Sequence, residues 1–129
     1  MKKVSFDFDS TLTRTDVQKF AKDLIDSGLV DVWICTSRFD NNRLINKDSN
    51  NDLFKLVDEL GISKNNIIFT NFEDKANYLN DDFIWHLDDD HDELDEINKR
   101  GKTIGISVFG NNVWRNKCIK FLINNINGK

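Results

Sequence analysis

The sequence predicts an α/β protein with a doubly wound, Rossmann-like parallel sheet of five strands. Short apolar stretches alternate regularly with amphipathic ones from the N-terminus onward. One apolar stretch, Val30–Thr36, is continuous, which is typical of a parallel strand buried on both faces. Alternating strands and helices of these lengths favour right-handed crossovers and helices on both faces of the sheet.

Five strands are expected at the apolar stretches. In chain order they cover Val4–Phe8, Val30–Thr36, Ile67–Thr70, Phe83–Leu87 and Thr103–Phe109. If the first three extend to one side of the sheet and the last two to the other, the strand order is 5-4-1-2-3. The order then reverses between the first and the fourth strand, where doubly wound sheets form their ligand crevice.

Helices are expected between the strands, at Thr15–Ser27, Asp52–Leu60, about Glu73–Leu79, His91–Arg100 and about Val113–Ile126. Thr15 and Gln18 predict a capping box on the first helix, and Gly28 predicts its end. The last helix is expected to bury Ile119, Leu122, Ile123 and Ile126. Between the second strand and its helix, Phe39–Asn51 reads as a polar loop.

Composition narrows the function classes. The 129 residues suit a single domain, and 39% hydrophobic with 31% charged residues is typical of a soluble globular protein. Short apolar runs and a strand that starts directly after Met1–Lys3 predict no membrane span and no signal peptide. The net charge of −4 argues against tight non-specific nucleic-acid binding. Cys35 and Cys118 are expected to be reduced and buried, which favours a cytoplasmic location.

Two acids at the end of the first strand, Asp7 and Asp9, are the most informative feature for function. Carboxylates this close repel each other unless a divalent cation or a shared proton relieves the repulsion. A bare pair of this kind indicates only ordinary strand-end and turn acids. Here Thr36, Lys75 and Asp88–Asp89 follow at or near later strand ends. Because those ends share one edge of a parallel sheet, we expect the acids to converge on one crevice.

With these segments in order, the chain resembles the haloacid dehalogenase-like (HAD) phosphohydrolase superfamily, in its capless phosphatase branch. The resemblance runs from Val4 to about Phe109. It rests on four segments: DFDSTLT (Asp7–Thr13), VWICTSR (Val32–Arg38), the lysine of EDKANYL (Glu73–Leu79) and IWHLDDDHDE (Ile84–Glu93). The order and spacing of the four segments carry more weight than any one of them.

The resemblance implies a phosphatase that hydrolyses a phosphate monoester through an aspartyl-phosphate. Asp7 would be the nucleophile, and Asp9 the general acid and then the base. Thr36 and Lys75 would neutralise the phosphate charge. Substrate contacts are expected from the small and basic residues beside these groups, namely Ser10, Thr11, Ser37 and Arg38.

The cofactor implied by the resemblance is Mg²⁺. Its ligands would be the carboxylate of Asp7, the backbone carbonyl of Asp9 and the carboxylate of Asp89. Asp88 would hold a metal-bound water or orient Lys75. The run Asp88–Asp90 permits a slip of one residue, so the division between Asp88 and Asp89 stays open at this point.

The segments after the first and second motifs, Leu12–Asp31 and Arg38–Asp74, are too short for a cap domain. An open site suits a bulky phosphorylated substrate: a nucleotide, a polynucleotide 3′-phosphate end or a phosphoprotein. A partner subunit could also close it, and the oligomeric state is left open. The loop Phe39–Asn51 is the expected specificity element.

Two alternatives lack turnover. A receiver-like signalling domain would share the sheet and the acidic cluster, but it needs an acceptor Asp after the third strand, where Phe69–Asn71 stands. It also needs a lysine after the fifth strand, where Gly110-Asn111 stands. A catalytically silent phosphate-binding relative is the other alternative. His86, inside an apolar strand, is expected to be a hydrogen-bonded interior residue and not a catalyst.

Overall fold

The computed structural model describes residues 1–110 and 112–128. Five strands form one sheet: β1 (Lys3–Phe6), β2 (Asp31–Thr36), β3 (Ile67–Phe69), β4 (Phe83–Asp88) and β5 (Ile104–Ser107). All neighbouring strands are parallel, and their order is β3-β2-β1-β4-β5. This is the predicted order read from the opposite edge, so the predicted α/β class and the reversal between β1 and β4 are confirmed.

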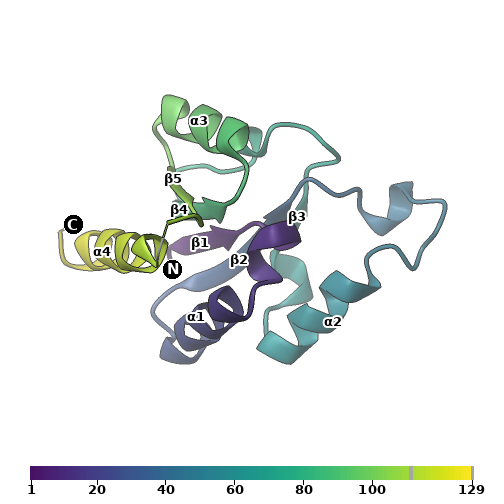
Figure 1. Cartoon of the computed structure of the whole chain (residues 1–129), viewed down its shortest axis with the longest axis horizontal. Helices are drawn as coiled ribbons and strands as arrows, with labels where there is room; N and C mark the ends of the chain where they lie inside the picture. Colours follow the sequence, from purple (N-terminus) through teal and green to yellow (C-terminus); the bar gives the residue numbers. More distant parts are fainter. Residues whose placement is uncertain (111, 129) are drawn as a thin grey trace.

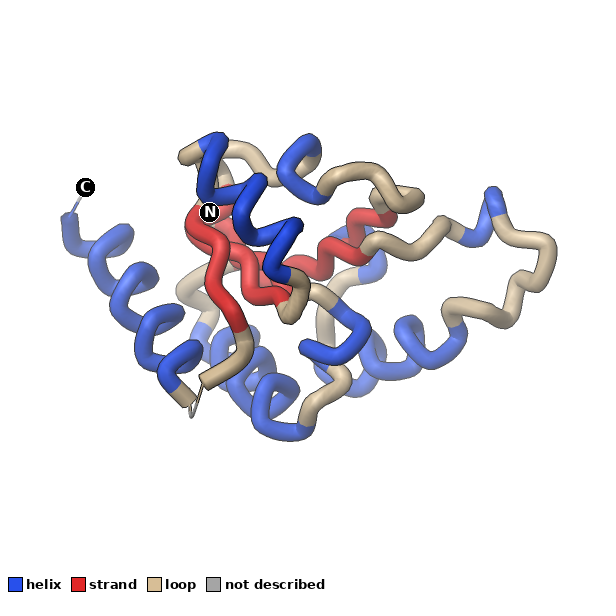
Figure 2. The backbone as a smooth tube through the Cα atoms, turned by 45° about the horizontal axis from the view of Figure 1, so that its top comes forward, coloured by secondary structure: helices blue, strands red, loops and turns tan. Residues whose placement is uncertain are grey.

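The described residues contain four α-helices: α1 (Thr15–Ser27), α2 (Asn51–Leu60), α3 (His91–Arg100) and α4 (Val113–Gly128). Helices α1, α2 and α4 lie on one face of the sheet, and α3 covers the other (Figure 1). Short helical turns complete the chain: η1 (Phe8–Leu12), η2 (Asn41–Arg43), η3 (Lys64–Asn66) and η4 (Lys75–Asn77). Figure 2 shows the strands at the centre, between the helices.

The main core lies between the sheet and α1, α2 and α4. Aromatic rings dominate it: Trp85 meets Phe6 edge-on with ring centroids 5.4 Å apart, and Trp114 meets Phe20 at 5.4 Å. Large aromatic side chains bury much apolar surface and favour such edge-to-face contacts. A smaller core under α3 contains the residues Cys35, Ala76, Leu79, Phe83 and Ile97.

Both cysteines are buried and unpaired, as predicted. Burial raises the pKa of the Cys35 thiol to about 12 and also raises the pKa of Cys118. A thiol with so high a pKa stays protonated at neutral pH and is a poor nucleophile. Neither cysteine is therefore a candidate nucleophile.

The predicted capping box on α1 is wrong. Arg14 occupies the N-cap position, and Thr15 is already the first helical residue, so its hydroxyl cannot cap the helix. Asp16 accepts the Val17 N–H at 2.9 Å instead. The predicted end of α1 is right, because Gly28 adopts the left-handed conformation with φ 67°.

Two further expectations fail for local reasons. In α4, Leu122 is buried as predicted and Ile119 packs against the main core, but Trp114 and Cys118 complete the buried stripe. Trp114 fixes the rotation of the helix, which leaves Ile123 and Ile126 49% and 44% exposed. The expected helix at residues 73–79 is a single 3₁₀ turn, η4. A segment of seven residues offers too few hydrogen bonds to offset the cost of nucleating an α-helix.

The connections on either side of β2 contain no additional domain. Residues 7–30 form only η1, α1 and loops, and residues 37–66 form only η2, α2, η3 and loops. The segment from β2 to α2 extends away from the sheet, at the right of Figure 1. The carboxyl edge of the sheet is therefore bordered by loops.

Candidate active site

A buried lysine joins two carboxylates at the carboxyl edge of the sheet. Lys75 Nζ lies 2.7 Å from Asp7 Oδ1 and 2.7 Å from Asp88 Oδ2. All three residues are buried, and even Asp7, the most open, has an exposed fraction of only 5%. Because the donor is an ammonium group, both hydrogen bonds are charge-assisted and stronger than bonds between neutral groups. The fold thus joins residues from three separate segments of the chain.

Strand pairing explains why Asp7 and Asp88 lie side by side. β1 and β4 are neighbours, and the Asp7 N–H donates to the Leu87 carbonyl at 2.9 Å, which holds the two strand ends level. Lys75 begins the turn η4, whose first N–H donates to Glu93 Oε1 of α3 at 3.3 Å. That bond anchors the turn against α3, so the lysine side chain reaches the strand ends from the α3 face. Burial raises the pKa of Glu93.

Asp88 is saturated with protein donors. Its Oδ1 accepts the N–H groups of Asp89 and Asp90 at 2.8 and 3.1 Å. Its Oδ2 accepts from Lys75 Nζ and His86 Nε2, each at 2.7 Å. A carboxylate has about four lone-pair positions, and here all are used. Although burial opposes it, the His86 hydrogen bond and the Lys75 charge hold the pKa of Asp88 below its usual range.

His86 is the interior histidine that the sequence predicts. It lies two residues before Asp88, so both side chains point to the same face of β4. Burial lowers the pKa of His86, so the ring is neutral at pH 7. The Asp88 carboxylate can only accept, so Nε2 carries the proton and donates to it, and Nδ1 accepts from the Ser5 hydroxyl 2.9 Å away. His86 is therefore placed to orient the Asp88 carboxylate.

Asp89 lies within reach of Asp7. The Thr11 hydroxyl is 3.3 Å from Asp7 Oδ2 and 3.4 Å from Asp89 Oδ1, and it can donate to one of them at a time. Asp7, Asp88 and Asp89 each place one oxygen within 4.8 Å of the other two. Opposite ligands of octahedral Mg²⁺ are about 4.2 Å apart. Because Asp88 is saturated, Asp7 and Asp89 are the carboxylates with capacity left for an ion.

The local charge balance also fits a divalent cation. Three carboxylates surround one ammonium group, so full ionisation leaves two negative charges in excess. Burial raises the pKa of Asp7 to about 8, against the opposing attraction of Lys75. Although burial of Lys75 opposes it, attraction to Asp7 and Asp88 raises the lysine pKa, so Lys75 stays charged. A hard cation with oxygen ligands would relieve the remaining repulsion.

Asp9 does not point into this cluster. Arg38 Nε and Nη2 donate to its two oxygens at 3.0 and 2.7 Å. The same guanidinium donates to both oxygens of Asp52, at 2.8 and 3.0 Å, and lies 4.9 Å from the centre of the Phe8 ring. Hydrogen bonds to these carboxylates raise the pKa of Arg38, and the hydrogen bond from Arg38 lowers the pKa of Asp52. Arg38, the predicted substrate-binding arginine, thus binds both carboxylate oxygens of Asp9, the predicted general acid.

The other predicted site residues lie around the two clusters. Thr36 is fully buried at the end of β2, and its hydroxyl accepts the Arg38 N–H at 3.3 Å. Ser37 is half-buried and its carbonyl accepts the Phe72 N–H at 2.8 Å. Ser10 is exposed in a left-handed conformation, φ 62°, within the tight turn that follows β1. Thr11 is buried, and its hydroxyl lies between the carboxyl groups of Asp7 and Asp89.

Sequence reasoning missed two residues. Asp52 was expected only as the start of a helix, yet it shares Arg38 with Asp9. His86 was recognised as an interior residue, but its hydrogen bond to Asp88 was not foreseen. For His86 a signal existed in its spacing, because residues i and i+2 of a strand share a face. For Asp52 the sequence held no such signal, because only the folded loop between β2 and α2 brings this residue to Arg38.

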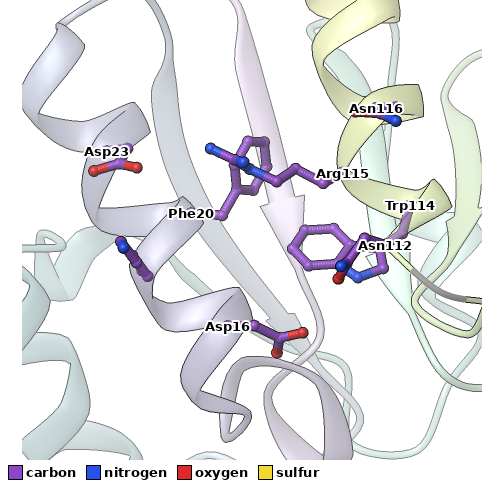
Figure 3. A pocket seen from close by; sticks show the side chains of 8 residues that line it. Asp16, Phe20, Asp23, Asn112, Trp114, Arg115 and Asn116 are labelled. Carbon is purple, nitrogen blue, oxygen red and sulfur yellow. The ribbon is translucent and has the colours of Figure 1, made fainter.

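A separate hollow lies between α1 and the start of α4 (Figure 3). It measures about 260 Å³, and Arg115 of α4 reaches across it to lie 5.7 Å from the centre of the Phe20 ring. Its lining combines acidic and basic side chains, including Asp16, Asp23 and Arg115. None of the carboxylates of the Lys75 cluster lines it, so it is distinct from the candidate site.

Among the described residues, no helix combines the length and the apolar character that crossing a membrane requires. The comparisons with known proteins add no assignment. No protein-family model, curated protein or solved structure matches the chain.

Proposed function

We propose that this protein is a Mg²⁺-dependent phosphatase that hydrolyses a phosphate monoester through an aspartyl-phosphate on Asp7. One observation carries the proposal: Asp7, Lys75 and Asp89 come from three segments and meet at the point where the strand order reverses. A nucleophilic carboxylate, a fixed cation and a second acid with ligand capacity are the groups that phosphoryl transfer requires. The predicted HAD-like motif order supports the same proposal.

In the first step, a carboxylate oxygen of Asp7 attacks phosphorus and the bond from phosphorus to the leaving oxygen breaks. Asp9 gives its proton to that oxygen, which departs as an alcohol. Lys75 is held 2.7 Å from Asp7 and neutralises charge on the transferring group. Bound Mg²⁺, held by Asp7 and Asp89, would supply the charge neutralisation that lets a carboxylate approach a phosphate dianion.

In the second step, water attacks the phosphorus of the aspartyl-phosphate. Asp9, now a carboxylate, takes a proton from this water, and the bond between phosphorus and the Asp7 oxygen breaks. Inorganic phosphate leaves, and both aspartates return to their starting states. The scheme gives each acid one role per step and needs no further co-reactant.

Asp9 must leave Arg38 and take up a proton from solvent before it can protonate a leaving group, because both of its oxygens accept hydrogen bonds from the guanidinium. The Asp9 side chain is 54% exposed and that of Arg38 22%, so water screens the pair. A substrate phosphate competes for the same guanidinium with the same bidentate geometry. Substrate binding thus supplies the ligand that replaces Asp9 on Arg38.

The strand order does not support a receiver-like domain. Receiver domains use the order 2-1-3-4-5, with the third strand next to the first. Here β3 is an edge strand that pairs with β2, and the residues after it are Thr70 and Asn71. The acids meet around the end of β1, so the acceptor that best fits this sheet is Asp7.

Hydrolysis of p-nitrophenyl phosphate tests the proposal directly. We expect Mg²⁺-dependent release of nitrophenol, lost on chelation and reduced at least about 1,000-fold in Asp7→Asn, because the amide is not a nucleophile. Brief incubation with a labelled ester should also leave acid-stable, hydroxylamine-sensitive label on the wild-type protein. Asp95→Asn, an exposed acid of α3, is the matched control. Equal activity in Asp7→Asn and wild type would contradict the proposal.

A further inference from the structure

An aromatic hollow adjoins the site on the side of Arg38. It has a volume of about 230 Å³ and is lined by Arg38, Phe39, Leu44, Ser49, Asn50 and Phe72. The rings of Phe39 and Phe72 face each other at a tilt of 59°, with centroids 5.2 Å apart. Asn50 is buried and donates to the Phe39 carbonyl at 2.9 Å, which fixes the loop that carries the ring. The hollow is therefore formed before any ligand arrives.

The position of Phe72 is unusual for a large apolar residue. The residue is 72% exposed, although it lies only three residues after the end of β3 and two after the buried Thr70. Asn71 and Phe72 both adopt left-handed conformations, with φ 56° and 65°. For a bulky residue this backbone is costly, and such strain persists only where the surrounding structure holds it. Burial in a core therefore does not explain where this ring sits.

Hydrogen bonds to the loop after β2 hold the strained residues. The Asn71 N–H donates to the Arg38 carbonyl at 3.2 Å, and the Phe72 N–H donates to the Ser37 carbonyl at 2.8 Å. These are the residues directly after Thr36, at the carboxyl edge. The exposed ring is thus tied by backbone bonds to the same loop that carries the arginine of the site.

Positive charge borders the rings. Arg38 lines the hollow and also binds Asp9, so it connects the hollow with the catalytic groups. The exposed Arg43 guanidinium lies 5.8 Å from the centre of the Phe39 ring and forms no ion pair with any carboxylate that the structure describes. A ligand that combines an aromatic ring with negative charge complements this combination.

We propose that the Phe39–Phe72 hollow binds the nucleobase of a nucleotide or nucleic-acid end whose phosphate is removed at Asp7. This inference rests on the proposed phosphatase function and specifies its substrate class. Bases stack on exposed aromatic side chains with little regard to sequence. Arg38 stands between Asp9 and the hollow, so the ring must be joined to the phosphate through a spacer, as it is through the sugar of a nucleotide. In an aryl phosphate the ring carries the phosphate directly.

Matched substrates test the proposal. Adenosine 5′-monophosphate is compared with ribose 5-phosphate, and adenosine 3′-monophosphate with ribose 3-phosphate, so that each pair differs only in the base. We expect kcat/KM to favour a nucleotide over its base-free partner by at least about 10-fold, the scale of one stacked base. A preference for the base-free sugar phosphate would overturn the proposal.

Variants then locate the effect. Phe72→Ala should lower the ratio of kcat/KM between nucleotide and sugar phosphate about 10-fold, whereas Phe72→Trp should preserve it. Leu29→Ala truncates another exposed apolar residue, 55% exposed and away from the loop after β2, and should leave the ratio unchanged. Because the Phe72 ring is exposed, its truncation should leave the fold intact, which thermal unfolding checks. An unchanged ratio in Phe72→Ala would overturn the proposal.

The outcomes separate this inference from the function on which it rests. A protein that hydrolyses p-nitrophenyl phosphate and both members of each pair equally well keeps the phosphatase function and loses the nucleobase site. A protein that hydrolyses no ester loses both. A third outcome would also overturn the proposal. If Phe72→Ala lowers kcat/KM for p-nitrophenyl phosphate and for a phosphotyrosine peptide as much as for a nucleotide, the hollow binds a ring that carries the phosphate directly. The substrate is then an aryl phosphate and not a nucleotide.

Discussion

Two basic residues each join two aspartates, but they do so in opposite environments. Lys75 holds Asp7 and Asp88 where all three side chains are 7% exposed or less. Arg38 holds Asp9 and Asp52, whose side chains are 54% and 60% exposed. Each cation thus takes one acid of the Asp7–Asp9 pair. The first cluster is desolvated and fixed, and the second is solvated and replaceable.

This difference matches the chemistry proposed for the two acids. A nucleophile gains from a rigid, desolvated environment in which a cation is already in place. A general acid and base must exchange protons with substrate and water, so it needs freedom to change partners. The structure therefore separates a preorganised half of the site from a releasable half, with η1 as the turn between them.

The largest effect should appear when the two acids on Arg38 are compared. Asp9→Asn should lower kcat for an ester with a poor leaving group about 100- to 10,000-fold, the usual contribution of general acid catalysis. Asp52→Asn removes the other carboxylate from the same guanidinium and should change kcat less than about threefold. Steady-state kinetics with an alkyl phosphate measures both.

Leaving-group chemistry sharpens that result. The decrease in kcat caused by Asp9→Asn should be smaller for p-nitrophenyl phosphate, because nitrophenolate departs without a proton. If Asp52→Asn is as damaging as Asp9→Asn, Arg38 and not Asp9 is the group that matters, and the assignment of Asp9 as the acid is wrong.

The next effect is on stability. Lys75→Met should destabilise the fold by about 3 kcal/mol, because it leaves the buried Asp88 carboxylate and the buried Asp7 carboxyl group without their cation. Arg38→Met should cost less than about 1 kcal/mol, because its ion pairs are exposed and screened. Urea unfolding followed by tryptophan fluorescence measures both, since Trp85 and Trp114 are buried in the main core. Equal decreases in the free energy of unfolding of the two variants would contradict the distinction between the Lys75 cluster and the Arg38 cluster.

The smallest effect concerns pH and metal. Burial raises the pKa of Asp7 to about 8, so the metal-free protein carries a proton there at neutral pH. A Mg²⁺ ion must displace this proton, so its apparent affinity should rise up to tenfold per pH unit below about 8 and level off above. Titration calorimetry at pH 6, 7 and 8 in buffers of different ionisation enthalpy measures the affinity and the released proton.

A matched pair of acids tests the ligand assignment in the same experiment. Asp89→Asn should weaken Mg²⁺ binding at every pH, whereas Asp90→Asn, whose carboxylate caps α3, should leave it within about twofold. Affinity that does not change with pH, or that falls equally in both variants, would remove Asp7 and Asp89 as the ligand pair.

Much of this architecture could be predicted from the sequence because the relevant signals are local. The apolar runs fixed the number of strands, and glycines at residues 28, 61 and 101 marked where three helices end. Strand-end positions selected Asp7 and Asp88, since the carboxyl ends of parallel strands share one edge. The helix expected at about Glu73–Leu79 is a single 3₁₀ turn instead, because a local pattern says little about how much room a connection has.

Partnerships between side chains depended on the tertiary structure. The run Asp88–Asp90 looks uniform in sequence, and only the donors supplied by His86, Lys75 and two N–H groups saturate Asp88 and leave Asp89 with ligand capacity. The ion pair between Asp9 and Arg38 could likewise not be predicted from the sequence. Residue type and strand position can be read from the local sequence. Burial and hydrogen-bond partners arise only when distant segments of the chain meet. Burial and partners are what distinguish one aspartate of the site from another.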